Sequence, residues 1–295
     1  MVTRRGRFIN WGDGNINAGA GSFGIGYISG AQNPSLWDTQ SVLFDGIQDW
    51  ASSSYNSDIF GPGTNLQWSY AWWLRKNGSG AWGPLSQTII ARWFNNTGNV
   101  FRCLGNQTVG RMGFFISTHQ NDTGGTVGQL LTPPTDELWH HYAMVYSGTT
   151  GTPGTALSAS ILQVYVDGVQ QALTFSGQMP ATSTLPTANI PLTLGRGAST
   201  TALYFSSGAM DEVAFFNRAL TGGEVADVYN AGNPIDIRTI TSVSASLRGY
   251  WAMGENHSGP TIPNLVSGSA FTLMNGTAGA NSTGSIEERY STNVP

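Results

Sequence analysis

Charged side chains are scarce in this sequence. Aspartate, glutamate, lysine and arginine make up 10% of its 295 residues, and the formal net charge is −4. An average globular domain has about 25% charged residues. A net charge this small and negative gives no reason to expect nucleic-acid binding. One basic cluster exists, at Arg4, Arg5 and Arg7, and it is either a solvated terminus or a contact for an acidic partner or a phosphate.

Cysteine is nearly absent, and long apolar runs are missing. Cys103 is alone, so no disulfide can form within the chain. No run of 18 apolar residues is present, which excludes a membrane-spanning helix, and the first residues contain no apolar segment of a signal peptide. We therefore expect a protein made in a reducing cytoplasm, without a Sec export signal and without membrane contact.

Glycine and aromatic residues are abundant, whereas charged residues are few. The chain has 39 glycines, and 11% of its residues are aromatic, including ten tryptophans. Aromatic residues at this frequency argue against disorder, and glycine suits tight turns. The composition predicts a folded, strand-rich protein.

Residues 1–40 differ from the rest. Glycines alternate with scattered aromatic residues and no strand or helix period is sustained. The segment is either a flexible leader or an arm that becomes ordered on a partner or a neighbouring subunit. For the second case we expect contacts from Arg4, Arg5, Arg7, Trp11, Phe23 and Tyr27.

Strand patterns begin at residue 41 and recur at short spacing. Leu66, Trp68, Tyr70, Trp72 and Leu74 alternate with polar or smaller residues, as in a strand with one face in a core. Turn-rich segments separate the strands, which predicts a sandwich or barrel. The expected strands are 41–45, 66–75, 88–94, 100–104, 111–117, 140–146, 162–166, 192–194, 210–216, 247–255 and 270–275.

One short helix is well marked, at 222–230. Thr221 is a suitable N-cap, and Glu224 three residues later completes a capping box. Asn230 to Gly232 supplies a C-terminal stop. We expect this helix to close one end of the sandwich.

Several motifs occur together in a familiar order. Residues 44–49 (FDGIQD), 139–146 (WHHYAMVY), 162–168 (LQVYVDG), 192–195 (LTLG), 208–213 (GAMDEV) and 217–221 (NRALT) resemble the laminin G-like, concanavalin A-like jelly-roll family. This resemblance implies an all-β fold of two antiparallel sheets over residues 41–232. Large aromatic residues such as Trp68, Trp72 and Trp139 are expected to fill the gap between the sheets.

Residues 233–295 form a third segment. Residues 249–259 (GYWAMGENHSG) are similar to the strand and turn that precede such domains, yet here they follow one. They also resemble tails of jelly-roll proteins encoded by bacteriophages. We expect a C-terminal extension that packs on or beside the sandwich.

Catalytic patterns are weak. The acid pairs Asp136–Glu137 and Asp211–Glu212 are adjacent on the chain, and neighbours on a strand point to opposite faces, so neither pair can form the facing dyad of a glycosidase. A dyad from distant strands stays open. His140 and His141 diverge for the same reason, so packed or surface histidines are favoured over metal ligands. We expect no enzyme activity.

Two binding sites are suggested by the resemblance. Related jelly rolls often bind calcium, and Asp45, Asp49 and Asp211 could supply oxygen ligands, unless they only cap turns or bond a loop. Trp73, Tyr142 and Tyr146 could line a concave sheet and stack on sugar rings, or they could belong to the core.

Two settings fit these features. In the first, the chain is a non-enzymatic bacteriophage virion protein, a capsid decoration or fibre-type subunit. Its arm docks on capsid or tail proteins, it forms a homo-oligomer, and its lectin-like jelly roll stabilises the particle or adheres to host-surface glycans. In the second, the chain is a free carbohydrate-binding or adhesion module of a cell. A glycoside hydrolase is the third alternative.

Overall fold

The computed structural model describes most of the chain after residue 37. The described ranges are 38–54, 67–77, 87–94, 98–106, 110–116, 126–148, 156–177, 191–197, 206–255, 257–266, 268–275 and 290–295. The expected docking residues Arg4, Arg5, Arg7, Trp11, Phe23 and Tyr27 lie outside these ranges.

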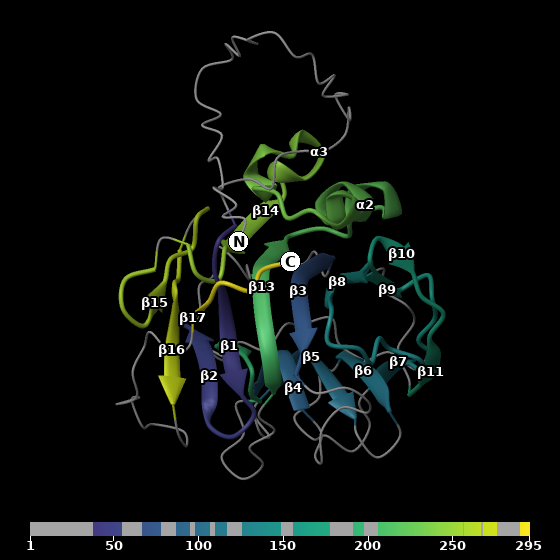
Figure 1. Cartoon of the computed structure of the whole chain (residues 1–295). Coiled ribbons are helices and arrows are strands. Elements are labelled where there is room, and N and C mark those ends of the chain that lie inside the picture. Colours follow the sequence, from purple (N-terminus) through teal and green to yellow (C-terminus); the bar gives the residue numbers. More distant parts are fainter. Residues whose placement is uncertain are drawn as a thin grey trace, which may run out of the picture. The chain divides into compact units, whose positions relative to one another are not determined.

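The described residues form two antiparallel sheets, as predicted (Figure 1). The eight-stranded sheet has the order β10 (Val169–Gln170), β9 (Leu162–Val166), β8 (Trp139–Tyr146), β3 (Trp68–Lys76), β13 (Ser207–Phe216), β1 (Ser41–Asp45) and β17 (Tyr290–Ser291), and β14 (Leu247–Trp251) also pairs with β13. The nine-stranded sheet has the order β11 (Thr174–Ser176), β7 (Thr126–Leu130), β6 (Arg111–Ile116), β5 (Gly98–Asn106), β4 (Gln87–Phe94), β12 (Leu192–Leu194), β2 (Asp49–Ser53), β16 (Phe271–Asn275) and β15 (Thr261–Ile262). This is the expected sandwich.

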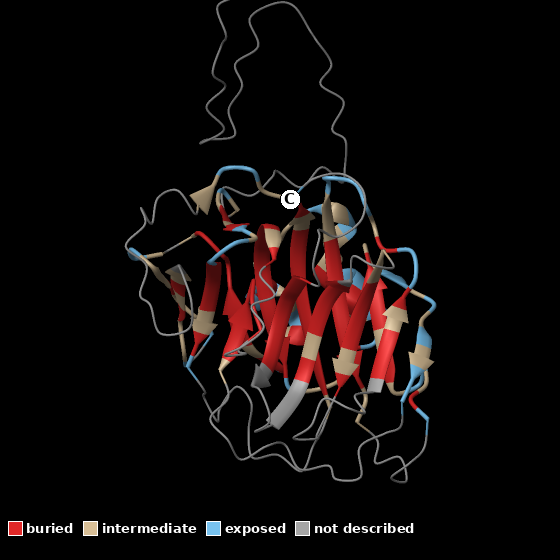
Figure 2. Cartoon of the chain, turned by 90° about the horizontal axis from the view of Figure 1, so that it is seen from below, coloured by how far each residue is buried: buried red, intermediate tan, exposed pale blue. Residues whose placement is uncertain are grey.

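The main core lies between the sheets, and most strand residues are buried (Figure 2). Trp68, Tyr70 and Trp72 on β3 point into it, as the alternation predicts. Trp72 stacks on Tyr142 of the neighbouring strand at 5.8 Å between ring centroids and 12° between planes. Trp139, which we expected in the same core, is half-buried instead, and its indole N–H donates to Asn293 Oδ1 at 2.7 Å.

A second apolar cluster lies on the outward face of the eight-stranded sheet. There α2 (Gly222–Tyr229), η3 (Asn230–Gly232), η4 (Ile237–Thr239) and α3 (Thr241–Ser244) follow β13. Val225 and Val228 of α2 belong to one buried cluster with Ala143 and Ala214 of the sheet. The helix therefore covers an outward sheet face, and it does not plug the gap between the sheets as we expected.

The capping box predicted for α2 is confirmed. Thr221 Oγ1 accepts the backbone N–H of Glu224, and the Glu224 carboxylate accepts the backbone N–H of Thr221. Both contacts satisfy N–H groups that have no partner inside the helix. None of the helices in the described ranges combines the length and apolarity of a membrane span.

The segment after residue 232 is an integral part of the sandwich. β14 pairs with β13 in the eight-stranded sheet, and β16 pairs with β2 in the nine-stranded sheet. Near the C-terminus, β17 pairs with β1. We expected an extension packed on or beside the sandwich, whereas these strands complete both sheets.

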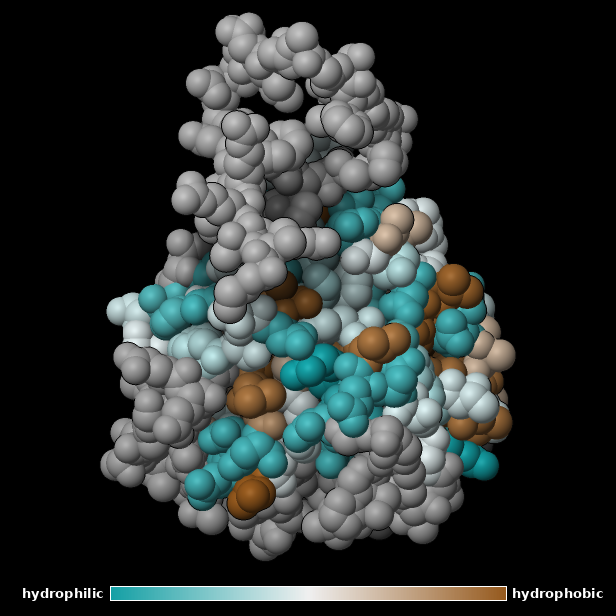
Figure 3. Space-filling view, viewed as in Figure 1, coloured by the Kyte–Doolittle hydropathy of each residue, from teal (hydrophilic) through white to brown (hydrophobic). Residues whose placement is uncertain are grey.

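Large apolar residues are exposed only singly in the described ranges. On the face drawn in Figure 3, hydrophobic residues lie in small separate areas among hydrophilic ones. The large apolar side chains with the greatest exposure are Ile47, Leu131, Leu138, Val169 and Val266. Single exposed apolar residues of this kind are normal on the surface of a folded protein.

Candidate functional site

A β-bulge interrupts β13 at its two acidic residues. Asp211 pairs with Trp73 of β3, and the next paired residue on β13 is Ala214, so the register shifts between them. Glu212 lies within this bulge with φ of +49°, a left-handed conformation that residues other than glycine rarely adopt. Met210 and Val213 both face the main core as a result. The simple alternation expected across Asp211 and Glu212 is therefore wrong.

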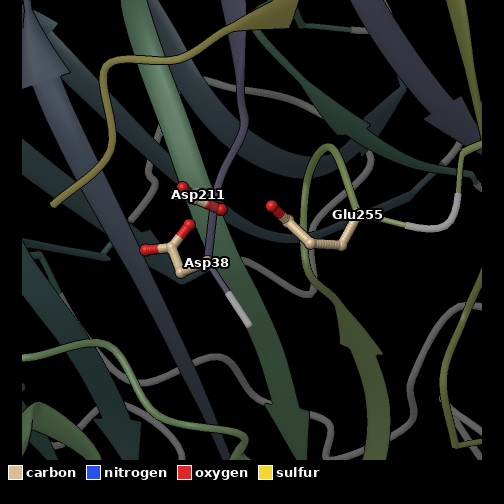
Figure 4. Close-up of side chains that lie close together, drawn as sticks. All are labelled: Asp38, Asp211 and Glu255. Atoms are coloured by element: carbon tan, nitrogen blue, oxygen red, sulfur yellow. The ribbon is translucent and has the colours of Figure 1, made fainter. Parts of the chain in front are cut away.

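Asp211 meets two other carboxylates, from segments far apart in the sequence. Asp38 lies just before β1, and Glu255 lies in the turn after β14. One oxygen from each of Asp38, Asp211 and Glu255 lies within 4.8 Å of the others. Figure 4 shows the three side chains pointing toward one another. We call this group the carboxylate cluster.

Hydrogen bonds fix the cluster but satisfy only part of it. Glu255 Oε1 accepts the backbone N–H groups of Thr39 at 2.6 Å and Gln40 at 2.7 Å, and Asp211 Oδ1 accepts the N–H of Glu212 at 2.8 Å. Within the described residues, both oxygens of Asp38, Asp211 Oδ2 and Glu255 Oε2 are buried and accept no bond from an N–H or hydroxyl group, and the carboxyl groups of Asp38 and Asp211 lie within hydrogen-bond reach of each other. Buried polar atoms without partners are uncommon in proteins and suggest a missing ligand.

Burial makes these acids hard to ionise. Asp211 is fully buried, and burial followed by the nearby charges of Asp38 and Glu212 raises its pKa well above its usual range. Burial together with the charge of Glu255 raises the pKa of Asp38 to about 7. A cation bound among these carboxylates would offset both effects by stabilising their charged form.

Glu212 extends the acidic region in another direction. Its side chain is 2% exposed, and its carboxylate accepts a hydrogen bond from the Tyr250 hydroxyl on β14. Burial raises the pKa of Glu212 well above its usual range, although the bond from Tyr250 lowers it. Neither Asp211 nor Glu212 lies at the surface, where it could meet a glycosidic bond.

The expected calcium ligands are only partly brought together. Asp211 belongs to the carboxylate cluster, but Asp45 stabilises a turn, since its Oδ1 accepts the backbone N–H groups of residues 47–49 at 2.8–3.0 Å. Asp49 follows that turn at the start of β2 and is not in the cluster. Asp38 and Glu255 were missed. Glu255 lies in the conspicuous WAMGE segment, whereas nothing local marks Asp38.

The expected sugar-stacking residues are buried. Tyr142 and Tyr146 lie in the core between the sheets, with exposed fractions of 2% and 5%. Trp73 is 4% exposed and packs against His141 and Tyr229. None of the three offers an open ring face to a sugar, which corrects this assignment in favour of the alternative that they are core residues.

The two adjacent histidines have different environments. His140 links two acids, with Nε2 2.8 Å from Asp136 Oδ1 and Nδ1 2.7 Å from Asp167 Oδ2. His141 is 1% exposed, and burial lowers its pKa to about 4. Because the two nitrogens of His140 face different carboxylates, this arrangement is an ion-pair bridge between loops, and no shared metal position results.

The fold has relatives among solved structures. One is a candidate carbohydrate-binding protein from Bacteroides ovatus. It is 16% identical, with a TM-score of 0.52 over 80% of this chain and 58% of that chain. A heptameric SAP-like pentraxin from Limulus polyphemus is 13% identical, with a TM-score of 0.47 over 83% of this chain and 98% of the other. The CBM40 domain of a Ruminococcus gnavus IT-sialidase is 12% identical, with a TM-score of 0.42 over 64% and 97% of the two chains.

At 16% identity, the match to the Bacteroides ovatus protein shows the fold alone, and this chain spans little more than half the length of that protein. Among curated protein sequences, none matches this chain. A family profile described as the concanavalin A-like lectin/glucanases superfamily matches residues 45–226. The match covers more than half of the chain and agrees with the two-sheet sandwich, so the protein belongs to the concanavalin A-like lectin/glucanase superfamily.

Proposed function

We propose that this protein is a non-enzymatic, glycan-binding jelly roll. The observation that supports the proposal is the burial of one acid pair, since Asp211 and Glu212 on strand β13 are 0% and 2% exposed. A glycosidase needs two carboxylates on opposite sides of a bond in a bound sugar. Asp211 and Glu212 are too deeply buried to flank such a bond. Because the superfamily contains both lectins and glucanases, the burial of this acid pair favours binding over hydrolysis.

The test is a glycan array probed with the full chain, followed by calorimetry on the strongest ligands. We expect saturable binding to at least one glycan class, with no release of reducing sugar from that ligand after long incubation. Cleavage of a bound glycan would overturn the non-enzymatic role. Complete absence of binding across the array would overturn glycan recognition.

The setting we propose is a bacteriophage virion, made in the host cytoplasm. There the chain is a capsid decoration or fibre-type subunit, as a homo-oligomer docked on capsid or tail proteins through residues 1–40. The resemblance of residues 249–259 to phage-encoded jelly-roll tails supports this setting. Mass spectrometry of purified particles tests it. We expect the chain at a fixed stoichiometry to the capsid protein, and its absence from particles would leave the free adhesion module of a cell as the alternative.

We further propose that the carboxylate cluster takes a structural calcium ion. Asp38, Asp211 and Glu255 would hold it, and backbone carbonyls or water would complete the six to eight oxygens that calcium prefers. The buried oxygens without donors support this assignment. We expect millimolar calcium to raise the melting temperature above that in chelator by several degrees.

A matched pair of variants tests the calcium ion itself. Asp211→Asn should abolish the calcium-dependent rise, whereas Asp227→Asn, which changes a helix residue that accepts a hydrogen bond from Ser242, should retain it. Equal melting temperatures of the natural chain in calcium and in chelator would contradict the assignment.

A further inference from the structure

Arginines are concentrated in the middle of the nine-stranded sheet. Its strands β4, β5 and β6 each carry one arginine, at positions 92, 102 and 111, and β4 to β7 carry no acidic residue. Asp49 on β2 is the one acid in all nine strands. In a chain with a net charge of −4, three neighbouring strands thus carry only positive charge, and the fourth, β7, carries none.

Strand alternation places two of these arginines on the outward face. Phe101 and Cys103 of β5 and Met112 and Phe114 of β6 belong to the core between the sheets. Their neighbours on each strand must point away from that core, so Arg102 and Arg111 do so. Phe115 of β6 and Gln129 of β7 share this face, and all four side chains are half-buried. We call them the arginine surface.

Phe115 lies flat on the sheet in this surface. A Cβ atom built on Gly113 would be 2.6 Å from Phe115 Cε2, so the ring lies over the glycine two residues before it. The Arg102 guanidinium carbon lies 4.8 Å from the centroid of that ring. This contact orients the guanidinium by cation–π attraction.

Arg111 is positioned by a hydrogen bond. Its Nη1 donates to Gln129 Oε1 at 3.2 Å, across the pair Gly113–Gln129 that joins β6 and β7. Arg111 and Phe115 are four residues apart on one strand, which corresponds to about 13 Å. The arginine surface therefore carries two oriented guanidinium groups, an amide and an aromatic ring over a length that exceeds one sugar ring.

We propose that the arginine surface is the glycan-binding face and that it selects saccharides with carboxylate groups. A guanidinium presents a fork of N–H donors that matches a carboxylate, and amides and guanidinium groups also bond sugar hydroxyls. With no acid on β4 to β7, nothing on these strands repels an anionic ligand. The inference rests on the proposed glycan binding and adds both its location and its ligand class.

The experiment compares glycans that differ by a carboxylate. Calorimetry with the full chain uses sialyllactose against lactose, and oligogalacturonate against its methyl ester. We expect the carboxylated member of at least one pair to bind at least about tenfold more tightly, the effect of one charge-assisted hydrogen bond. The advantage should shrink as salt rises.

Variants locate the site. Arg111→Gln and Arg102→Gln should each remove most of the advantage, and Gly113→Ala should weaken binding because it displaces the Phe115 ring. Arg248→Gln is the matched control. This arginine lies on β14 of the other sheet, where its guanidinium donates to the carbonyls of Ala245 and Leu247. Circular dichroism verifies that each variant is folded.

Each outcome has one meaning. Equal affinity for the carboxylated and the neutral member of each pair would overturn the selectivity but leave the proposed glycan binding intact. Oligoglutamate, which carries carboxylates but no sugar, would also overturn the selectivity for saccharides if it bound as tightly as the carboxylated glycans. Loss of the advantage in Arg248→Gln but not in Arg111→Gln would overturn the location. No binding of any of the four glycans would overturn this inference, and a negative glycan array would be required before the general function falls as well.

Discussion

The two sheets of this sandwich present their outward faces differently. The eight-stranded sheet is covered by its own chain, because the helices after β13 bury Ala143, Ala214 and Phe216 in a second apolar cluster. The nine-stranded sheet carries half-buried arginines and a flat phenylalanine on strands β5 and β6. One outward face therefore serves stability and has the carboxylate cluster beside it, whereas the other carries groups that can recognise an anionic ligand.

The largest effect is expected from removing the packing between the helices and the eight-stranded sheet. Leu220 is 3% exposed within the second apolar cluster. We expect Leu220→Ala to lower the free energy of unfolding by about 3 kcal/mol, measured by urea denaturation. Leu138, which is 64% exposed, is the control, and Leu138→Ala should change stability by less than about 0.5 kcal/mol. A small loss at Leu220 would show that the helices are not a stabilising cover.

The second-largest effect is expected from changing the pH when the carboxylate cluster holds no cation. The pKa of Asp38 is raised from 3.8 to about 7, so the folded state keeps a proton that the unfolded state has already lost. In chelator, stability should therefore fall as pH rises from about 4 to about 7, by on the order of 1–2 kcal/mol after allowance for solvent screening.

A variant isolates this contribution. Asp38→Asn should flatten the decline, because asparagine does not titrate. Urea denaturation at several pH values in chelator measures it. The same steep decline in Asp38→Asn and in the natural chain would assign the effect to other groups.

The third change is smaller and tests how α2 is held on its face. Thr221→Ala removes the N-cap acceptor for the backbone N–H of Glu224 and should cost about 1 kcal/mol. Thr221→Ser keeps the hydroxyl and should restore most of that loss. If alanine and serine behave alike in urea denaturation, the cap contributes nothing measurable.

The smallest effect is expected at His140. Hydrogen bonds from its ring to Asp167 and Asp136 raise its pKa above 6.5. The bridge is therefore complete below pH 6.5 and is lost as pH rises through the raised value, so stability should decline slightly in that window. His140→Gln should remove the decline in thermal melts at stepped pH, and an unchanged profile would exclude the bridge as its source.

Much of the fold could be predicted from local patterns. The strands at 162–166 and 192–194 have the predicted bounds, and the capping box of α2 is confirmed. Strands β2 and β7 were missed, because DWASS and TVGQL are short and weakly alternating, and their strand character depends on sheet neighbours.

The carboxylate cluster could be predicted only in part. Asp211 was named, but the bulge at Glu212 breaks the two-residue period on which its orientation was argued. Asp38 and Glu255 are 217 positions apart, and no sequence spacing relates them. Their proximity follows from the pairing of β1 and β14 with the same strand, β13, which is a property of the whole sheet.

The pairing of late strands with early ones has a consequence for how the chain folds. Ser41 of β1 lies opposite Ser291 of β17, and Ser53 of β2 lies opposite Phe271 of β16. Until these late residues emerge from the ribosome, β2 has an unpaired edge beside buried apolar surface. Such long-range closure slows folding, and open edges invite association with other chains. A truncation after residue 232 should therefore yield an aggregating fragment.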